Sequence, residues 1–286
     1  MTDELARALD GVRALVLDAD GVLMYRGRPV EGSVTAMRRL RDAGVPYRVV
    51  TNYSSTHRTT LAERFAAATG LPAEPDRIIT AASAAARYTA RRHPGAALLV
   101  LANADALREW DGQRVLSPSE AGADDARVDA VVIGDAGDDL SFGNMDIAFR
   151  HLRGGAEFIA MHRNPWWVTS RGPTLDAGSV VAGLEFALGR RAVVCGKPSP
   201  VVFREAVDEL RTDVAAADEA PLRLREVAMV GDDPRADVAA ARRAGLRGIL
   251  VLTGKTDADE ARAASRSVRL DAVAASLDDI VEQLLR

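Results

Sequence analysis

The sequence predicts an α/β protein: a Rossmann-like, doubly wound parallel sheet into which a second α/β domain is inserted. At both ends of the 286-residue chain, short apolar runs that stop at turn residues alternate with segments of helical periodicity. That alternation is typical of parallel strands covered by helices. The middle of the chain repeats it over a length sufficient for a domain. We therefore expect a discontinuous core of residues 1–78 and 192–286, and an inserted domain of residues 79–191.

The first predicted strand ends in two aspartates. Its apolar run begins at Ala14 and stops at Asp18, and Ala19, Asp20 and Gly21 follow. Aspartate and glycine are common turn residues, so this string alone is a weak sign of a site. Its position is informative, because ligands of open α/β sheets bind beyond the carboxyl ends of the strands.

The other elements follow from periodicity and stop signals. Apolar residues at helical spacing predict helices over 34–40 and 61–68, and a glycine follows each of them. Between these helices we predict a strand at 47–50 that ends in Thr51 and Asn52. In the inserted domain we predict helices at 81–92 and 145–152 and strands at 98–101, 131–133 and 158–161. Toward the carboxyl end we predict a helix at 202–210, a strand at 227–230 that ends in Gly-Asp-Asp, a helix at 238–244, a strand at 249–252 and a final helix at 280–285.

Composition excludes several classes of protein. With 48% hydrophobic and 27% charged residues the chain can bury a large core, and its net charge of -4 provides no basic field for nucleic acid. No apolar run approaches a membrane span and the amino terminus lacks a leader pattern, so we expect no membrane partner and a cytoplasmic location. Cys195 is the single cysteine, which excludes an internal disulfide and a cysteine metal cage.

Lysine is conspicuously rare. Of the 37 basic residues only Lys197 and Lys255 are lysines. A lysine kept against such a bias points to a position that needs a compact ammonium where a guanidinium would not fit. Lys197, in the string Cys-Gly-Lys-Pro, is the better candidate.

Four polar residues follow predicted core strands or precede core helices: Asp18, Thr51, Lys197 and Asp232. If the outer segments form one parallel sheet, these side chains meet at one edge of it. A carboxylate nucleophile, a hydroxyl, a cation and a metal-binding carboxylate are the set that phosphoryl transfer requires.

Charge implies a metal ion as cofactor. A phosphate dianion would be repelled by the aspartates unless a cation were present, and Mg²⁺ prefers oxygen ligands and bridges carboxylates to phosphate. Asp20 is then available to protonate a leaving group and to deprotonate the attacking water.

Taken together, these motifs resemble the haloacid dehalogenase-like superfamily, in its phosphatase branch with the class IIA cap. The motifs occur in the family's order: Asp18-Ala19-Asp20-Gly21, the strand end Val49 to Ser55, Gly196-Lys197-Pro198, and Gly231-Asp232-Asp233 with Asp237. The middle stretch is also similar to class IIA caps.

The resemblance implies a role for each matching residue and a small phosphorylated metabolite as substrate. Asp18 would form an aspartyl-phosphate and Asp20 would act as acid and then base. Thr51, Asn52 and Lys197 would bind the phosphoryl group. Asp18, the backbone oxygen of Asp20, and Asp232 would hold Mg²⁺, supported by Asp233 and Asp237.

Within class IIA the chain is most similar to the phospholysine/phosphohistidine/pyrophosphate phosphatase type, through the segments 161–167, 193–200 and 249–255. That type often has serine at the position of Asp20, whereas the pyridoxal-phosphate and nitrophenyl-phosphate relatives keep aspartate. Relatives with this cap often form dimers through it, so the resemblance also implies a homodimer through the cap. The cap residues predicted to contact the leaving group are His162, Arg163, Trp166 and Trp167; the alternative is that the tryptophans fill the cap's core or a subunit contact.

Two other functions stay open. One is a binding or regulatory protein that keeps the fold without turnover, and the other is a hydrolase directed at phosphoramidates or pyrophosphate. Residues 248–256 imitate a nucleotide-binding P-loop, but five residues separate their glycines where that loop needs four.

Overall fold

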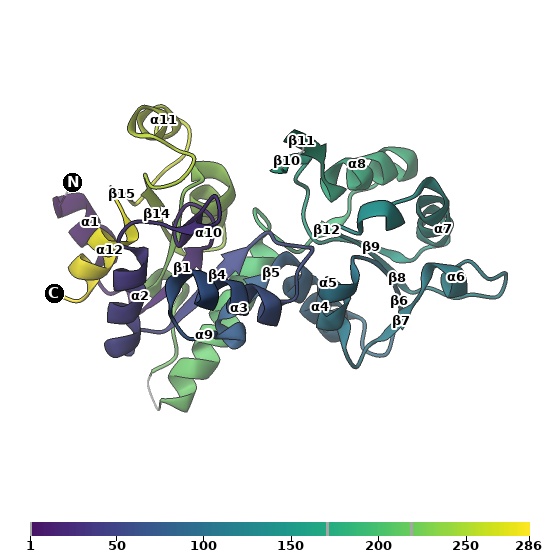
Figure 1. Cartoon of the computed structure of the whole chain (residues 1–286), viewed down its shortest axis with the longest axis horizontal. Coiled ribbons are helices and arrows are strands. Elements are labelled where there is room, and N and C mark those ends of the chain that lie inside the picture. Colours follow the sequence, from purple (N-terminus) through teal and green to yellow (C-terminus); the bar gives the residue numbers. More distant parts are fainter. Residues whose placement is uncertain (1, 170–171, 218–219) are drawn as a thin grey trace. The chain divides into compact units, whose positions relative to one another are not determined.

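The computed structural model describes residues 2–169, 172–217 and 220–286, and the chain divides into two compact units. The first unit comprises Met1–Thr51, Leu61–Ile79 and Lys197–Arg286, and the second comprises Asn52–Thr60 and Thr80–Gly196. Each unit contains its own parallel sheet covered by helices (Figure 1). The predicted fold class is confirmed.

The first unit contains a six-stranded sheet in the order β15-β14-β13-β1-β4-β5. The strands are β1 (Ala14–Asp18), β4 (Tyr47–Thr51), β5 (Ile78–Thr80), β13 (Val227–Gly231), β14 (Arg247–Val251) and β15 (Ala272–Ala274). Every pair from β15 to β4 is parallel. Every residue of β1, β4 and β13 is buried, which explains their nearly continuous apolar sequences.

The strand order reverses between β1 and β13. From β1 the chain proceeds to β4 on one side, whereas from β13 it proceeds to β14 on the other. Right-handed crossovers therefore place the connecting helices on opposite faces of the sheet. The gap between the carboxyl ends of β1 and β13 is thus a topological switch point, where open α/β sheets bind ligands.

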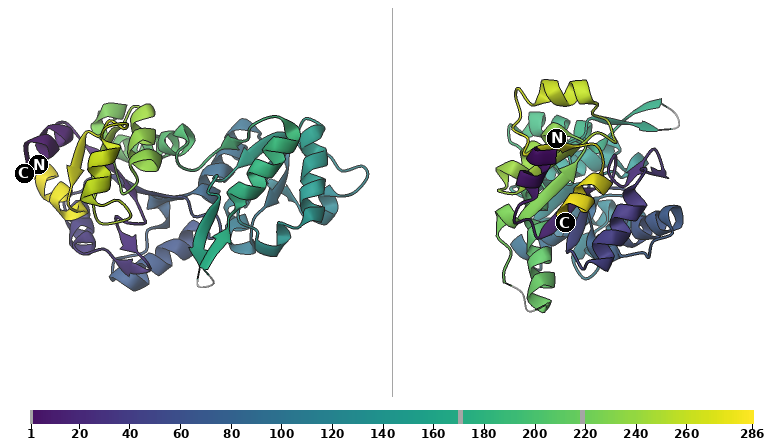
Figure 2. Two further views of the ribbon diagram at one scale, coloured as in Figure 1. Left: turned by 90° about the horizontal axis from the view of Figure 1, so that it is seen from above. Right: turned by 90° about the vertical axis from the view of Figure 1, so that its left-hand side faces the viewer.

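The helices of the first unit form two groups, and within each group they contact one another. One consists of α1, α2 and α12, and the other of α9, α10 and the π-helical turn η5. Their bounds are α1 (Thr2–Leu9), α2 (Ser33–Asp42), α9 (Pro200–Ala216), η5 (Pro234–Ala239), α10 (Ala240–Arg243) and α12 (Leu277–Leu284), with α11 (Ala258–Ala264) and the short turns η1 (Pro75–Arg77) and η4 (Leu224–Glu226). Helix α3 (Arg58–Thr69) begins in the second unit and continues into the first. Helices α1 and α12, near the two ends of the chain, lie side by side (Figure 2).

The second unit contains a five-stranded parallel sheet in the order β12-β9-β8-β6-β7. Its strands are β6 (Ala97–Leu101), β7 (Arg114–Leu116), β8 (Ala130–Ile133), β9 (Glu157–Ala160) and β12 (Val193–Val194). Its helices are α4 (Ala81–Arg92), α5 (Ala104–Leu107), α6 (Pro118–Ala121), α7 (Phe142–Arg153) and α8 (Ala177–Leu188), with the turns η2 (Arg108–Trp110) and η3 (Gly137–Asp139). Buried residues such as Ile133, Phe158 and Val181 join this sheet to α7 and α8.

Two hairpins complete the fold: β2 (Met24–Tyr25) with β3 (Arg28–Pro29), and β10 (Trp166–Thr169) with β11 (Gly172–Leu175). Cys195 is buried, as expected of a small core residue. Within the described part of the chain, no helix has the length and hydropathy needed to cross a membrane.

Candidate active site

Three buried carboxylates meet at the switch point of the first unit. Asp18 is the last residue of β1, Asp232 follows β13, and Asp237 lies in η5. One oxygen from each lies within 4.8 Å of the others. β1 and β13 are adjacent parallel strands, so the polar residues at their carboxyl ends lie close together.

Lys197 pairs with two of these carboxylates. Its Nζ lies 2.6 Å from Oδ1 of Asp18 and 2.8 Å from Oδ1 of Asp237, and all three side chains are less than a tenth exposed. Burial alone would disfavour the ammonium, but Asp18 and Asp237 outweigh it and raise the pKa of Lys197 above its ordinary value. Lys197 is therefore a permanent cation at the end of β1.

The residues of this cluster fit a divalent cation. Asp18, Asp232 and Asp237 against Lys197 leave a formal charge of about -2 when all are ionised. Burial and the charge of Asp237 raise the pKa of Asp18 well above its usual range, against the opposing effect of Lys197. A set of oxygen donors with two uncompensated charges is what Mg²⁺ prefers.

Asp20 differs from Asp18 in its surroundings. Its side chain is exposed to solvent, while the protein on its other side desolvates the carboxyl enough to raise its pKa, against the charges of Lys197 and Lys255. A carboxyl that is accessible and holds its proton more tightly than usual suits proton transfer to a leaving group.

Glycine at position 21 is required by the approach of the two aspartate loops. Gly21 has a φ of 79°, and a Cβ built there would lie 2.3 Å from Oδ2 of Asp232. Positive φ is strained for other residues, and a methyl group would displace the buried carboxylate. The glycine of the Asp-x-Asp-Gly string therefore leaves the space that the Asp232 carboxylate occupies, and it also permits the turn.

Asp233 and Asp237 have different contacts, although the resemblance assigns both the same supporting role. Asp237 enters the cluster and also accepts a 3.0 Å hydrogen bond from the backbone N–H of Asp233. Asp233 instead caps η5, accepting from the N–H groups of Arg235 and Ala236 at 2.7 and 2.8 Å, and pairs with Lys255.

Lys255 is the site residue that sequence reasoning missed. Its Nζ lies 2.8 Å from Oδ2 of Asp233, and its backbone N–H donates to Oδ2 of Asp232 at 2.8 Å. The rarity of lysine was the available signal, because both lysines of the chain lie at the acidic cluster.

The two predicted phosphate ligands from the end of β4 fall in different units. Thr51 is a buried residue of the first unit, and the register pairs its neighbour Val50 with Asp18, so Thr51 belongs to the same edge of the sheet. Asn52 belongs to the second unit, where a Cβ at Gly196 would lie 2.7 Å from its Oδ1.

The four cap residues have distinct environments in the second unit. His162 is buried, with Nε2 2.8 Å from Oγ of Ser54, and its Nδ1 accepts a 3.2 Å hydrogen bond from the N–H of Asn164. Burial lowers its pKa, against Asp176 and Asp135, so the ring is neutral at pH 7.

The other three cap residues lie nearer the surface. Arg163 pairs with the buried Glu185 at 2.6 Å. Trp166 and Trp167, at the start of β10, are 56% and 47% exposed, so they do not fill the core of this unit.

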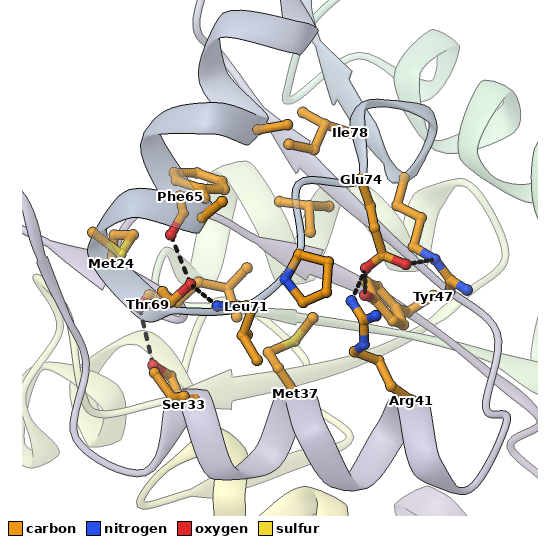
Figure 3. A pocket seen from close by; sticks show the side chains of 17 residues that line it. Met24, Ser33, Met37, Arg41, Tyr47, Phe65, Thr69, Leu71, Glu74 and Ile78 are labelled. Atoms are coloured by element: carbon orange, nitrogen blue, oxygen red, sulfur yellow. Dashed lines mark hydrogen bonds and ion pairs between the residues drawn. The ribbon is translucent and has the colours of Figure 1, made fainter.

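An apolar cavity of about 60 Å³ in the first unit is not part of this site (Figure 3). It lies between α2 and α3, and its polar end consists of Tyr47, Arg41 and Glu74, with Tyr47 Oη donating to Glu74 at 2.7 Å. None of its lining residues belongs to the acidic cluster, so we regard it as a packing cavity.

Comparison with known proteins places this geometry in a family. The model of haloacid dehalogenase-like hydrolases matches residues 15–114, and the HAD-hydrolase-like model matches residues 194–280. A phospholysine phosphohistidine inorganic pyrophosphate phosphatase from Danio rerio is 31% identical over 290 residues, covering 99% of this chain and 98% of that protein.

Solved structures agree with the sequence relatives. A p-nitrophenyl phosphatase from Archaeoglobus fulgidus has a TM-score of 0.83 at 29% identity, covering 95% of this chain and 98% of that one. A glycerol phosphate phosphatase from Mycobacterium tuberculosis, solved in complex with calcium, has a TM-score of 0.78 at 28% identity. The match covers 96% of this chain and 76% of that one. The chain therefore belongs to the haloacid dehalogenase-like hydrolases, as a phosphatase of class IIA.

Proposed function

We propose that this phosphatase is Mg²⁺-dependent and hydrolyses a small phosphorylated metabolite through an aspartyl-phosphate intermediate. The observation that carries the proposal is the position of Asp18, a buried carboxylate at the end of β1, 2.6 Å from the Lys197 ammonium and within 4.8 Å of Asp232 and Asp237. A carboxylate nucleophile needs positive charge beside it, because the phosphate that it attacks is itself an anion.

The chain's own residues divide the reaction between them. A carboxylate oxygen of Asp18 attacks phosphorus as the bond to the leaving group breaks, and Asp20 donates its proton to the leaving oxygen. Asp20 then takes a proton from water, whose oxygen attacks the aspartyl-phosphate and releases phosphate and free Asp18. Throughout, Lys197 neutralises charge on the phosphoryl oxygens, and the Thr51 hydroxyl at the same edge donates to one of them.

The cation belongs among Asp18, the backbone oxygen of Asp20, and Asp232, with Asp237 beside them. When bound, Mg²⁺ would supply the charge that allows a phosphate dianion to approach these carboxylates. The crystal of the related glycerol phosphate phosphatase, which contains calcium, supports a divalent cation in this family.

Hydrolysis of p-nitrophenyl phosphate tests the proposal. We expect turnover with Mg²⁺, none in a chelator, and a loss of at least about a thousandfold in Asp18→Asn, which removes the nucleophile. Equal, near-zero rates for the wild type and Asp18→Asn in Mg²⁺ would leave only the binding or regulatory function.

A second variant tests the role of Asp20. Nitrophenolate departs without a proton, whereas the alkoxide of glycerol phosphate needs one. Asp20→Asn should therefore slow release of alkyl leaving groups by about a hundredfold or more, and slow formation of the intermediate from the nitrophenyl ester much less. Equal losses on both substrates in the rate at which the intermediate forms would show that Asp20 is not the general acid.

The substrate is proposed only as a class, because the named relatives act on different phosphates. A phosphate-release screen that includes sugar phosphates, glycerol phosphates, pyridoxal phosphate, pyrophosphate and phosphoamino acids would select among them, and would also test the phosphoramidate or pyrophosphate alternative. The roles of four cap residues in choosing the leaving group stay predictions: His162, Arg163, Trp166 and Trp167. The exposure of both tryptophans supports them. A homodimer through the cap also stays a prediction.

A further inference from the structure

The loop after β14, residues Thr253–Thr256, connects the two aspartate-bearing loops of the active site. Thr253 Oγ1 donates to the backbone oxygen of Gly21 at 2.5 Å, and Thr256 Oγ1 donates to that of Asp232 at 2.6 Å. Gly254 lies so close that a Cβ there would be 2.0 Å from Oδ2 of Asp232. The loop is therefore held against the cluster by groups other than its lysine.

Lys255 is fixed within this loop even though its side chain is 57% exposed. Its backbone N–H donates to Oδ2 of Asp232, which places the start of the side chain beside that carboxylate. Its Nζ then lies 2.8 Å from Asp233 and 3.9 Å from Asp232.

The two lysines divide the acidic cluster between them. Lys197 lies between Asp18 and Asp237, and Lys255 lies nearest Asp233 and Asp232. The chain uses arginine at 35 of its 37 basic positions, yet both of its lysines lie beside these aspartates. A compact ammonium can approach two carboxylates where a planar guanidinium needs more space.

Resting on the proposed Mg²⁺-dependent function, we propose that Lys255 is a positioning residue that acts as an internal counter-ion. It holds Asp232 and Asp233 together before the cation binds, and it weakens cation binding by placing a positive charge beside the same carboxylates. The affinity for Mg²⁺ is thereby set below what the aspartates alone would produce.

Isothermal titration of the substrate-free protein with Mg²⁺ tests this inference without using activity. Lys255→Met should bind Mg²⁺ about two- to fivefold more tightly than the wild type, the range that partly exposed charge pairs produce. Without the counter-ion, Lys255→Met should also melt at a lower temperature in a chelator. At a fixed excess of Mg²⁺ its melting temperature should rise more than that of the wild type, because tighter binding stabilises the folded state more. Lys255→Arg keeps the charge on a side chain that is 57% exposed, so its affinity should lie closer to the wild type than that of Lys255→Met.

The control is Arg262→Met on α11. Arg262 lies seven residues after Lys255 and forms an exposed ion pair with Asp259, so the substitution also removes one positive charge. It should leave the affinity unchanged, because charges more than a Debye length away, or exposed to solvent, are screened. Unchanged or weaker binding by Lys255→Met, or equal tightening by Arg262→Met, would overturn the counter-ion role alone. A wild-type protein that binds no Mg²⁺ would overturn both the role and the proposed function.

Discussion

Replacing Lys197 with methionine should destabilise the first unit strongly, and more so at neutral than at acidic pH. The ammonium lies 2.6 and 2.8 Å from two carboxylates, all of them buried. Removing one partner from a buried ion pair leaves an uncompensated charge and typically costs about 3 to 5 kcal/mol. Methionine keeps most of the side-chain volume, so the loss is mainly electrostatic.

Proton uptake limits the size of that loss. The variant can replace the missing ammonium by protonating one carboxyl, whose ordinary pKa is 3.8. Protonation of such a group costs about 4 kcal/mol at pH 7 and about 2 kcal/mol at pH 5. Because the folded variant holds a proton that the unfolded chain releases, its stability falls as pH rises from 5 to 7. The wild type, with Lys197 in place, should show a smaller change.

Urea unfolding in a chelator, followed by far-ultraviolet circular dichroism, measures this difference. All three tryptophans lie in the second unit, so their fluorescence reports on that unit and serves as an internal reference. The control is Lys255→Met, the same substitution at an exposed position, which should cost less than about 1 kcal/mol. A loss for Lys197→Met no larger than for this control, or one that is equal at pH 5 and pH 7, would refute the reasoning.

Two further predictions concern Gly21 and His162. Gly21→Ala should lower phosphatase activity by at least about tenfold, because the added methyl group would lie 2.3 Å from Asp232 and the backbone would be strained; activity within twofold of the wild type would contradict this. The second unit should lose stability as pH falls below the ordinary histidine pKa of 6.5, because buried His162 resists a proton that the unfolded chain accepts. Tryptophan-monitored unfolding of the wild type and His162→Gln checks this: the variant should lose part of the pH dependence, and identical profiles would exclude His162 as its source.

Local pattern was sufficient for the elements that position the site. The apolar runs ending at Asp18, Thr51 and Asp232 became fully buried strands, and the alternation at both ends of the chain correctly indicated one sheet. These predictions succeeded because a central parallel strand is buried on both faces, so its sequence alone reveals it. The hairpin β10–β11 was not predicted, since its exposed tryptophans and glycine show neither helical nor strand periodicity.

Short strings at the ends of buried strands were enough to predict the fold class and the family, and they supplied the candidate site residues Asp18, Lys197 and Asp232. Tertiary contacts select the aspartates that share the cluster with Lys197: Asp237 turns toward it through η5, whereas Asp233 caps that turn. The tertiary structure also places Lys255 beside an aspartate 23 residues earlier in the chain. Such contacts depend on strand register and loop packing between distant segments, and no local spacing encodes them.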